Sequence, residues 1–475
     1  MEKLARRRWE ELKLMKADVA AKHRFAGGWR TTVRAGAMAV LIAGGASLAA
    51  AEDATTTATP AAPAAAPAPA APAPDAKAAP DAKASDTKAG PEGAASGDSA
   101  SVIIPVLLAR ELRDDPPPLS LLDLPPPDLG IAGAKLAITD NNTTGHFMNQ
   151  KFTLDTLEEA DPAKLIQDVV QKVDAGAHFV LVDAKPDTLL KLADALHGKE
   201  ALLINYAAPD DRLREEDCRP QVMHTAPTRS MLADALAQYL VWKKWSRWLL
   251  VLGPQENDKL FADALRRAAK RFGAKIVEER IFQYESGSRR SDGGYEQIQQ
   301  QIPTFTQSAP EYDVLIVADE GNLFGDYLPY RTWDPRPVAG SSGLVPMSWH
   351  PAIELWGGTQ FQNRFKRQAD RTMRPLDYNA WMAARMVGEA ASRTKSGKYQ
   401  DLVAFMKSPN FELAAFKGVG LSLRNWNGQL RQPVLVASPK LLVSVSPQQG
   451  FLHQFSELDT LGVDKPETKC KAYTQ

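Results

Sequence analysis

Polar side chains stand directly after several short apolar runs of this 475-residue sequence, where they could hydrogen-bond a small molecule. They are Asp183, after residues 179–182; Asn205 and Tyr206, after 201–204; and Asp319 and Glu320, after 314–318. Ligands of open α/β sheets bind outside the carboxyl ends of the strands, so these positions are candidate ligand-binding residues. For Asp319 and Asn205 the alternative is a structural role, capping the helices that follow.

Aromatic side chains stand near the expected crossing between two sheets and could form an apolar wall for a ligand: Tyr330, Trp333 and Trp349. The alternative for such residues in a Pro-rich loop is packing. Because the candidates are acidic and aromatic, we expect a neutral or cationic ligand, held through hydroxyl or amine groups. If the side chain of Lys185 or Arg331 turns into the cleft, an anionic ligand is expected instead.

The motifs of several common chemistries are missing. The seven histidines are scattered, and the sequence has no HExxH, CxxC, GxSxG or GxxxxGK[ST] pattern. We therefore expect a protein that is not an enzyme, without metal or cofactor. The only two cysteines, Cys218 and Cys470, lie beyond an export signal, so they are predicted to form a disulfide.

An alternation of buried strands with amphipathic helices must position these residues. Short apolar runs, such as 248–252 and 314–318, are separated by helical patterns such as Leu260–Phe272, which Gly273 ends. This alternation predicts an α/β fold of two doubly wound parallel-sheet lobes joined by a hinge. The expected ranges are 101–226 for the first lobe, 227–348 for the second, 349–410 for helices returning to the first lobe, and 411–475 for C-terminal strands and a tail.

The N-terminal 100 residues carry export and spacer signals. Residues 1–51 hold ten basic and four acidic residues and end in an apolar run with Ala49-Ala50-Ala51, as in a cleaved signal peptide. The alternative is a retained membrane anchor, and Met15 could be the true start. Residues 52–100 read as a disordered linker rich in Ala and Pro. The remaining chain is acidic by six charges, which argues against nucleic acid as a partner.

Several stretches resemble known binding proteins. GIAGAKLAITDNNTTGHFMNQKFTLD resembles the opening of branched-chain amino acid-type binding proteins. PLSLLDLPPPDLGIAG, DYLPYRTWDPRPVAGSSGLVP and AAFKGVGLSLRNWNGQLRQPVLVA resemble a narrower group, the ABC substrate-binding proteins associated with PQQ-dependent alcohol dehydrogenase systems. The resemblance covers nearly all of residues 101–470.

The resemblance implies a type I periplasmic-binding fold, a periplasmic location, and a monomer that hands a small solute to an ABC permease of the inner membrane. The turns after the third and fourth strands, Asp183–Pro186 and Asn205–Ala208, lack the Ser/Thr residues that hold an amino acid carboxylate in this class. Two rival functions stay open. One is a periplasmic sensor or accessory protein of the dehydrogenase, binding a protein partner; the other is a periplasmic enzyme.

Overall fold

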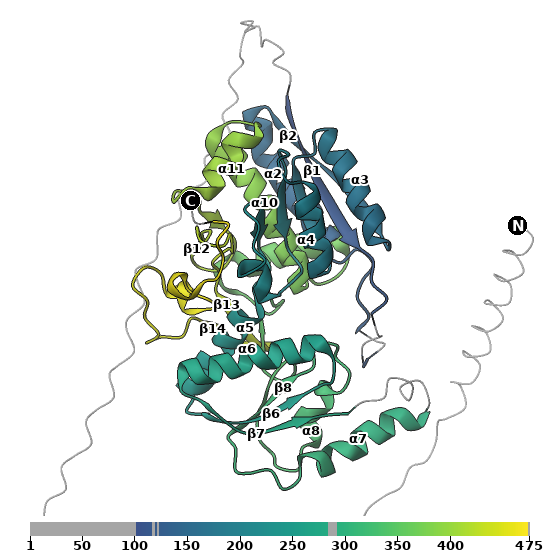
Figure 1. The fold of residues 1–475 in the computed structure, drawn as a ribbon, viewed down its shortest axis with the longest axis vertical. Coiled ribbons are helices and arrows are strands. Elements are labelled where there is room, and N and C mark those ends of the chain that lie inside the picture. Colours follow the sequence, from purple (N-terminus) through teal and green to yellow (C-terminus); the bar gives the residue numbers. More distant parts are fainter. Residues whose placement is uncertain (1–100, 116–118, 121–122, 284–291, 474–475) are drawn as a thin grey trace, which may run out of the picture. The chain divides into compact units, whose positions relative to one another are not determined.

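The computed structural model describes residues 101–115, 119–120, 123–283 and 292–473, all within one compact unit, residues 93–475. The predicted signal peptide and linker lie outside the described residues. Two parallel sheets with helices on both faces form the core of this unit (Figure 1). The predicted fold class is confirmed.

The first sheet has the order β2-β1-β3-β4-β5, and all its strands run parallel. Its strands are β1 (Val102–Glu111), β2 (Gln150–Glu159), β3 (Phe179–Asp183), β4 (Leu202–Asn205) and β5 (Val222–His224). The helices between these strands are α2 (Ile131–Gly145), α3 (Pro162–Asp174) and α4 (Pro186–Ala195). This sheet with its helices is hereafter the first lobe.

Alternate residues of β1 point to opposite faces of the sheet, which gives the first lobe two apolar cores. Ile104, Val106 and Leu108 pack with α2, while Leu107 and Ala109 pack with α3 and α4. Later in the chain come α9 (Gly358–Ala369), α10 (Pro375–Thr394), α11 (Tyr399–Lys407), and the short strands β11 (Leu413–Ala414) and β12 (Gly420–Leu421). Helix α10 packs against α2, so this part of the chain completes the first core.

The second sheet, with the order β7-β6-β8-β9, is also parallel. Its strands are β6 (Arg247–Leu252), β7 (Lys275–Ile281), β8 (Val314–Ala318) and β9 (Val338–Gly340), and its helices are α5 (Arg229–Trp242), α6 (Glu256–Phe272), α7 (Asp292–Thr306) and α8 (Leu328–Arg331). This sheet with its helices is hereafter the second lobe. Gly273 ends α6 in the left-handed conformation (φ 78°), as the sequence predicts.

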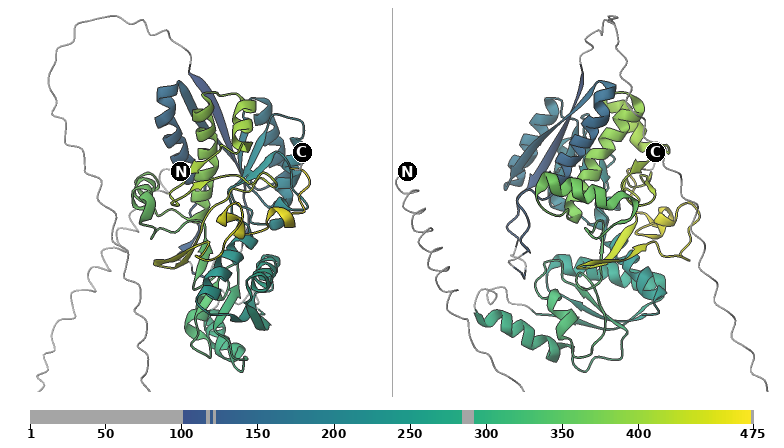
Figure 2. Two further views of the ribbon diagram at one scale, coloured as in Figure 1. Left: turned by 90° about the vertical axis from the view of Figure 1, so that its left-hand side faces the viewer. Right: turned by 180° about the vertical axis from the view of Figure 1, so that it is seen from behind.

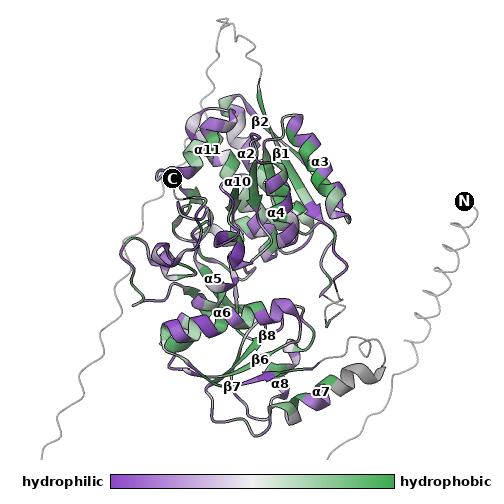
Figure 3. Cartoon of the chain, in the orientation of Figure 1, coloured by the Kyte–Doolittle hydropathy of each residue, from purple (hydrophilic) through white to green (hydrophobic). Residues whose placement is uncertain are grey.

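A small antiparallel sheet, β10-β13-β14, packs against α5. Its strands are β10 (Val345–Met347), β13 (Val434–Ser438) and β14 (Leu441–Ser446), and Figure 2 shows β13 and β14 among the last, yellow part of the chain. Helix α5 therefore lies between two sheets. It is buried on nearly all sides, including Asp234 and Gln238. In Figure 3, α3 and α6 by contrast mix hydrophobic and hydrophilic residues, as expected for helices with one solvent-facing side.

Candidate functional site: a cavity between the two lobes

The carboxyl ends of strands from both sheets meet at one cavity of about 890 Å³, hereafter the inter-lobe cavity. Its first-lobe wall comes from the segments after β1, β3 and β4, including Arg113, Lys185 and Ala207. Its second-lobe wall comes from the segments after β6 and β8, including Asn257 and Glu320. This is the position at which open α/β sheets bind ligands.

Three helices begin at this cavity, each with a local reason to start there. Pro186 is the first residue of α4, where its fixed φ suits a helix and its missing N–H is no loss. Thr228 caps α5, because its side chain accepts a hydrogen bond from the amide of Met231 (3.0 Å). At α6, Gln255 and Asp258 form a reciprocal capping box.

Arg229, the first residue of α5, links the loops of the two sheets. Its Nη1 lies 3.1 Å from a carboxylate oxygen of Asp210, which follows β4. Its Nε and Nη2 donate to the two oxygens of Glu320, which follows β8, at 2.9 and 2.7 Å. The side chain of Arg229 is only 3% exposed, whereas those of Asp210 and Glu320 are 11% and 25% exposed, so the cation is the most buried member of this triad. A buried cation of this kind is tolerated because it is paired on both sides.

The charges of the inter-lobe cavity nearly cancel. Four basic and five acidic side chains line it: Arg113, Lys185, Arg212 and Arg229, against Asp115, Asp187, Asp210, Glu256 and Glu320. Each of the three arginines in the lining already forms ion pairs: Arg113 with Asp183, Arg212 with Asp187 and Asp217, and Arg229 with Asp210 and Glu320. The lining therefore presents carboxylate and amide groups rather than an uncommitted guanidinium.

Burial raises the pKa of three carboxyl groups at or next to this cavity. It raises the pKa of Asp183, with Arg113 and Arg110 opposing the shift, and that of Glu320, with Arg229 opposing it. Burial also raises the pKa of Asp258 to about 6, although its carboxylate accepts the amide of Glu320 (2.8 Å). While these carboxyl groups are ionised they repel an added anion, and an anion bound nearby would raise their pKa further.

Of the eight predicted ligand-binding residues, Glu320 alone belongs to the lining of this cavity. Asp183 is buried behind it, held by Arg113 and Arg110. Tyr206 is also fully buried, with its ring against Gly130. Both residues adjoin lining residues, Ala184 and Ala207, so the sequence located the correct loops but not the side chains that face the cavity.

The side chains of Asn205 and Asp319 bind backbone amides of the loops that follow them, although neither is the N-cap residue of the next helix. The Asn205 side-chain oxygen accepts the amides of Ala207 and Ala208 (3.2 and 2.9 Å), and its amide donates to the Ala208 carbonyl. The carboxylate of Asp319 accepts the amides of three successive residues, 323–325, at 2.7–2.9 Å. Their hydrogen bonds shape the loops that form the cavity wall.

The predicted aromatic wall is wrong for this cavity. Trp349 is 0% exposed and lies in the core of the first lobe, stacked on Tyr378 at 4.7 Å. Tyr330 and Trp333 are 83% and 56% exposed but lie beside α7, where the Trp333 amide donates to Thr306. Trp349 instead packs with the aromatic rings of Phe361 and Tyr378 in the core of the first lobe.

The sequence interpretation missed Arg229 and Asp210. A signal was present for Arg229, since a cation in the first turn of a helix opposes the helix dipole and needs a compensating partner. Asp210, five residues beyond Asn205, carried no comparable signal.

The predicted disulfide between Cys218 and Cys470 is present, with a Cα–Cα distance of 5.6 Å. Across the described residues, no group of three or more His, Cys, Asp or Glu side chains could hold a metal ion. The same part of the chain contains no helix that is long and apolar enough to cross a membrane.

Comparison with known proteins agrees with this arrangement. Residues 129–301 match the family described as periplasmic binding protein. No curated protein sequence matches the chain.

Several solved structures share the fold. A branched-chain amino acid ABC transporter periplasmic ligand-binding protein from Burkholderia xenovorans is 15% identical, with a TM-score of 0.60, over 78% of this chain and 100% of that one. A leucine-, isoleucine-, valine-, threonine- and alanine-binding protein from Brucella ovis is 15% identical, with a TM-score of 0.56, over 73% and 92%. A solute-binding protein of an ABC transporter from R. palustris, in complex with benzoate, is 11% identical, with a TM-score of 0.53, over 78% and 99%.

Proposed function

We propose that this protein, whose fold is that of the type I periplasmic binding proteins, binds a small solute in the inter-lobe cavity for an ABC-type importer. The observation that carries the proposal is the convergence of strand ends and helix starts from both lobes on one cavity of about 890 Å³. That volume is typical of small-molecule sites. Binding would close the lobes around a hinge and would involve no covalent chemistry.

The charges of the cavity favour a neutral or cationic solute with hydrogen-bonding groups. The excess of carboxylates and the engagement of Arg113, Arg212 and Arg229 leave no guanidinium for an added carboxylate. Lys185 is the exception, because its ammonium lies 4.0 Å from Glu111 and is mostly exposed. Amide groups of Gln255 and Asn257 could orient hydroxyl or amine groups of a solute.

We further propose where this protein works and which process it serves. Resemblance to the group associated with PQQ-dependent alcohol dehydrogenase systems supports an exported protein that serves periplasmic alcohol oxidation. Purification of the mature protein from the periplasm, with an N-terminus near Glu52, would support export with cleavage after Ala51. Intact protein retained in the membrane would contradict it.

A filled-cavity variant tests the site. Ala207 lines the cavity with a small side chain, so Ala207→Trp should occupy solute space without removing a polar partner. Ala404→Trp, on an exposed position of α11, is the matched control. A thermal-shift screen of small alcohols, amines, aldehydes and acids, followed by calorimetry, should give solutes that bind the wild type and Ala404→Trp but not Ala207→Trp. Equal binding to all three proteins would reject this cavity as the site.

A further inference from the structure

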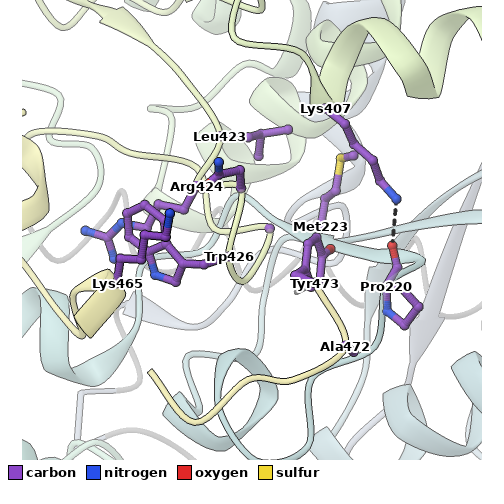
Figure 4. A pocket seen from close by; sticks show the side chains of 11 residues that line it. Pro220, Met223, Lys407, Leu423, Arg424, Trp426, Lys465, Ala472 and Tyr473 are labelled. Atoms are coloured by element: carbon purple, nitrogen blue, oxygen red, sulfur yellow. Dashed lines mark hydrogen bonds between the residues drawn. The ribbon is translucent and has the colours of Figure 1, made fainter. Parts of the chain in front are cut away.

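A second cavity, of about 780 Å³, lies within the first lobe and the C-terminal part of the chain, and shares no lining residue with the inter-lobe cavity. It lies where the segment before β5, the end of α11, the loop 423–428 and the last described residues meet. In the view of Figure 4, Trp426, Arg424 and Lys465 lie on one side, and Lys407, Met223 and Tyr473 on the other.

The side chains that line the second cavity carry a net positive charge. It contains Lys407, Arg424 and Lys465 and no carboxylate. Among the described residues, neither lysine forms an ion pair. Behind the wall, the carboxylate of Asp459 pairs with two guanidinium groups, Arg424 at 2.9 Å and Arg431 at 2.8 Å, and Asp464 also interacts with Arg424.

The two lysines are the groups that can reach an anion. Arg424 is committed, because it donates to Asp459 and to the carbonyls of Leu458 and Leu461. Lys407 uses one donor on the Pro220 carbonyl (3.1 Å), which leaves two of its three N–H groups. Lys465 is exposed at the opposite side of the cavity.

Apolar and aromatic side chains form the rest of the wall: Met223, Leu423, Trp426 and Tyr473. Tyr473 is fixed by donating its hydroxyl to the Val222 carbonyl, and Gly428 permits this approach, since a Cβ there would lie 2.3 Å from that hydroxyl. The disulfide at Cys470 holds the segment that carries Tyr473. The hydrogen bond and the disulfide therefore fix the position of Tyr473 in the wall of the second cavity.

We infer that the second cavity binds a small organic monocarboxylate with a flat apolar body. The carboxylate would lie between the ammonium groups of Lys407 and Lys465, and the apolar body against Trp426 and Met223. A multiply charged phosphate fits less well, because the forked donors of Arg424 are already occupied and much of the wall is apolar. This site does not depend on the function of the inter-lobe cavity.

Calorimetry with three probes tests the inference: phenylacetate, 4-phenylbutyrate and indole-3-acetate. At least one should bind the intact mature protein, while 2-phenylethanol, which lacks the charge, should bind at least tenfold more weakly. Lys465→Glu and Lys407→Glu should each weaken the carboxylate at least tenfold. Lys398→Glu, at the opposite end of α11 and outside the cavity, is the matched control and should change affinity less than twofold.

The lysine variants test the second cavity separately from the inter-lobe cavity. Because the two lysines are exposed, their variants should fold, and far-ultraviolet circular dichroism checks that they do. Silence of all three carboxylates would overturn the inference, as would unchanged affinity in both lysine variants. Loss of carboxylate binding in Ala207→Trp would also overturn it, since the probe would then occupy the inter-lobe cavity.

Discussion

The two cavities have similar volumes, but the charged side chains that line them differ in sign. In the inter-lobe cavity, buried Arg229 is matched by Asp210 and Glu320, and carboxylates outnumber cations. In the second cavity, Lys407 and Lys465 lie on opposite sides, and the lining contains no carboxylate. The arginines of the inter-lobe cavity are held in ion pairs, whereas Lys407 and Lys465 form none within the part of the chain that the structure describes, which is why we propose these two lysines for a ligand. Each prediction below changes one cavity and should leave the other unaffected.

The largest effect is expected from removing the disulfide. Cys218 and Cys470 are separated by 252 residues, so the chain-entropy model gives a stabilisation of up to about 5 kcal/mol. The double variant Cys218→Ala/Cys470→Ala should lower the free energy of unfolding in urea by up to that amount. It should also weaken carboxylate binding, since Ala472 and Tyr473 would lose their anchor. A matching loss of solute binding in the inter-lobe cavity would contradict the separation of the two sites.

Arg229→Met should be the next most damaging change. It leaves Asp210 and Glu320 without their shared cation at a shielded position, which we expect to cost about 4 kcal/mol. Arg212→Met removes a second cavity arginine whose ion pairs are more exposed, so it should cost less than about 1 kcal/mol. Urea unfolding of both variants measures the contrast; equal losses would show that the triad has no special role.

Acid pH should stabilise the wall of the inter-lobe cavity through Asp258. Burial raises its pKa from 3.8 to about 6, so the folded protein binds this proton more tightly than the unfolded chain does. The free energy of unfolding should therefore rise as pH falls from about 6 to about 4, by at most about 3 kcal/mol from this group.

Asp258→Asn removes that titration and should flatten the rise, which urea unfolding at several pH values would show. The control is Asp263→Asn, on an exposed side chain of the same helix. A wild-type slope retained in Asp258→Asn would contradict the assignment of the titration to Asp258.

The smallest effect on stability is expected in the second cavity. Lys465→Glu alters an exposed, unpaired side chain, so the free energy of unfolding should change by less than about 0.5 kcal/mol. The same variant should nonetheless weaken carboxylate binding at least tenfold. A large stability loss would mean that Lys465 holds the structure, as Arg229 does, and would remove the contrast between the cavities.

The sequence predicted the sheets and the binding loops better than the side chains within them. Runs such as 179–182 and 314–318 became β3 and β8, because a short apolar segment between turns can satisfy its backbone only within a sheet. Asp183, Asn205 and Glu320 therefore lie near the inter-lobe cavity, as expected from strand ends. Whether a residue at a strand end turns inward or outward depends on partners distant in sequence, as for Asp183 with Arg113.

Other features depend on tertiary contacts that no local pattern reveals. Trp349 lies in the first core, where Tyr378 of α10 stacks on it, and α5 is buried on nearly all sides because β13 and β14 return to cover it. The second cavity combines Lys407, Trp426 and Tyr473, which are dispersed over the last 70 residues and share no spacing motif. The disulfide could be predicted from the sequence because two cysteines allow only one pairing.

Calorimetry of the mature protein against neutral hydroxylated compounds, amines, simple carboxylates and branched-chain amino acids tests whether the inter-lobe cavity is the solute site. We expect tight binding of a neutral or cationic compound, lost in Ala207→Trp and retained in Lys465→Glu. Tight binding of only a plain carboxylate or a leucine-like amino acid, lost in Ala207→Trp, would contradict it.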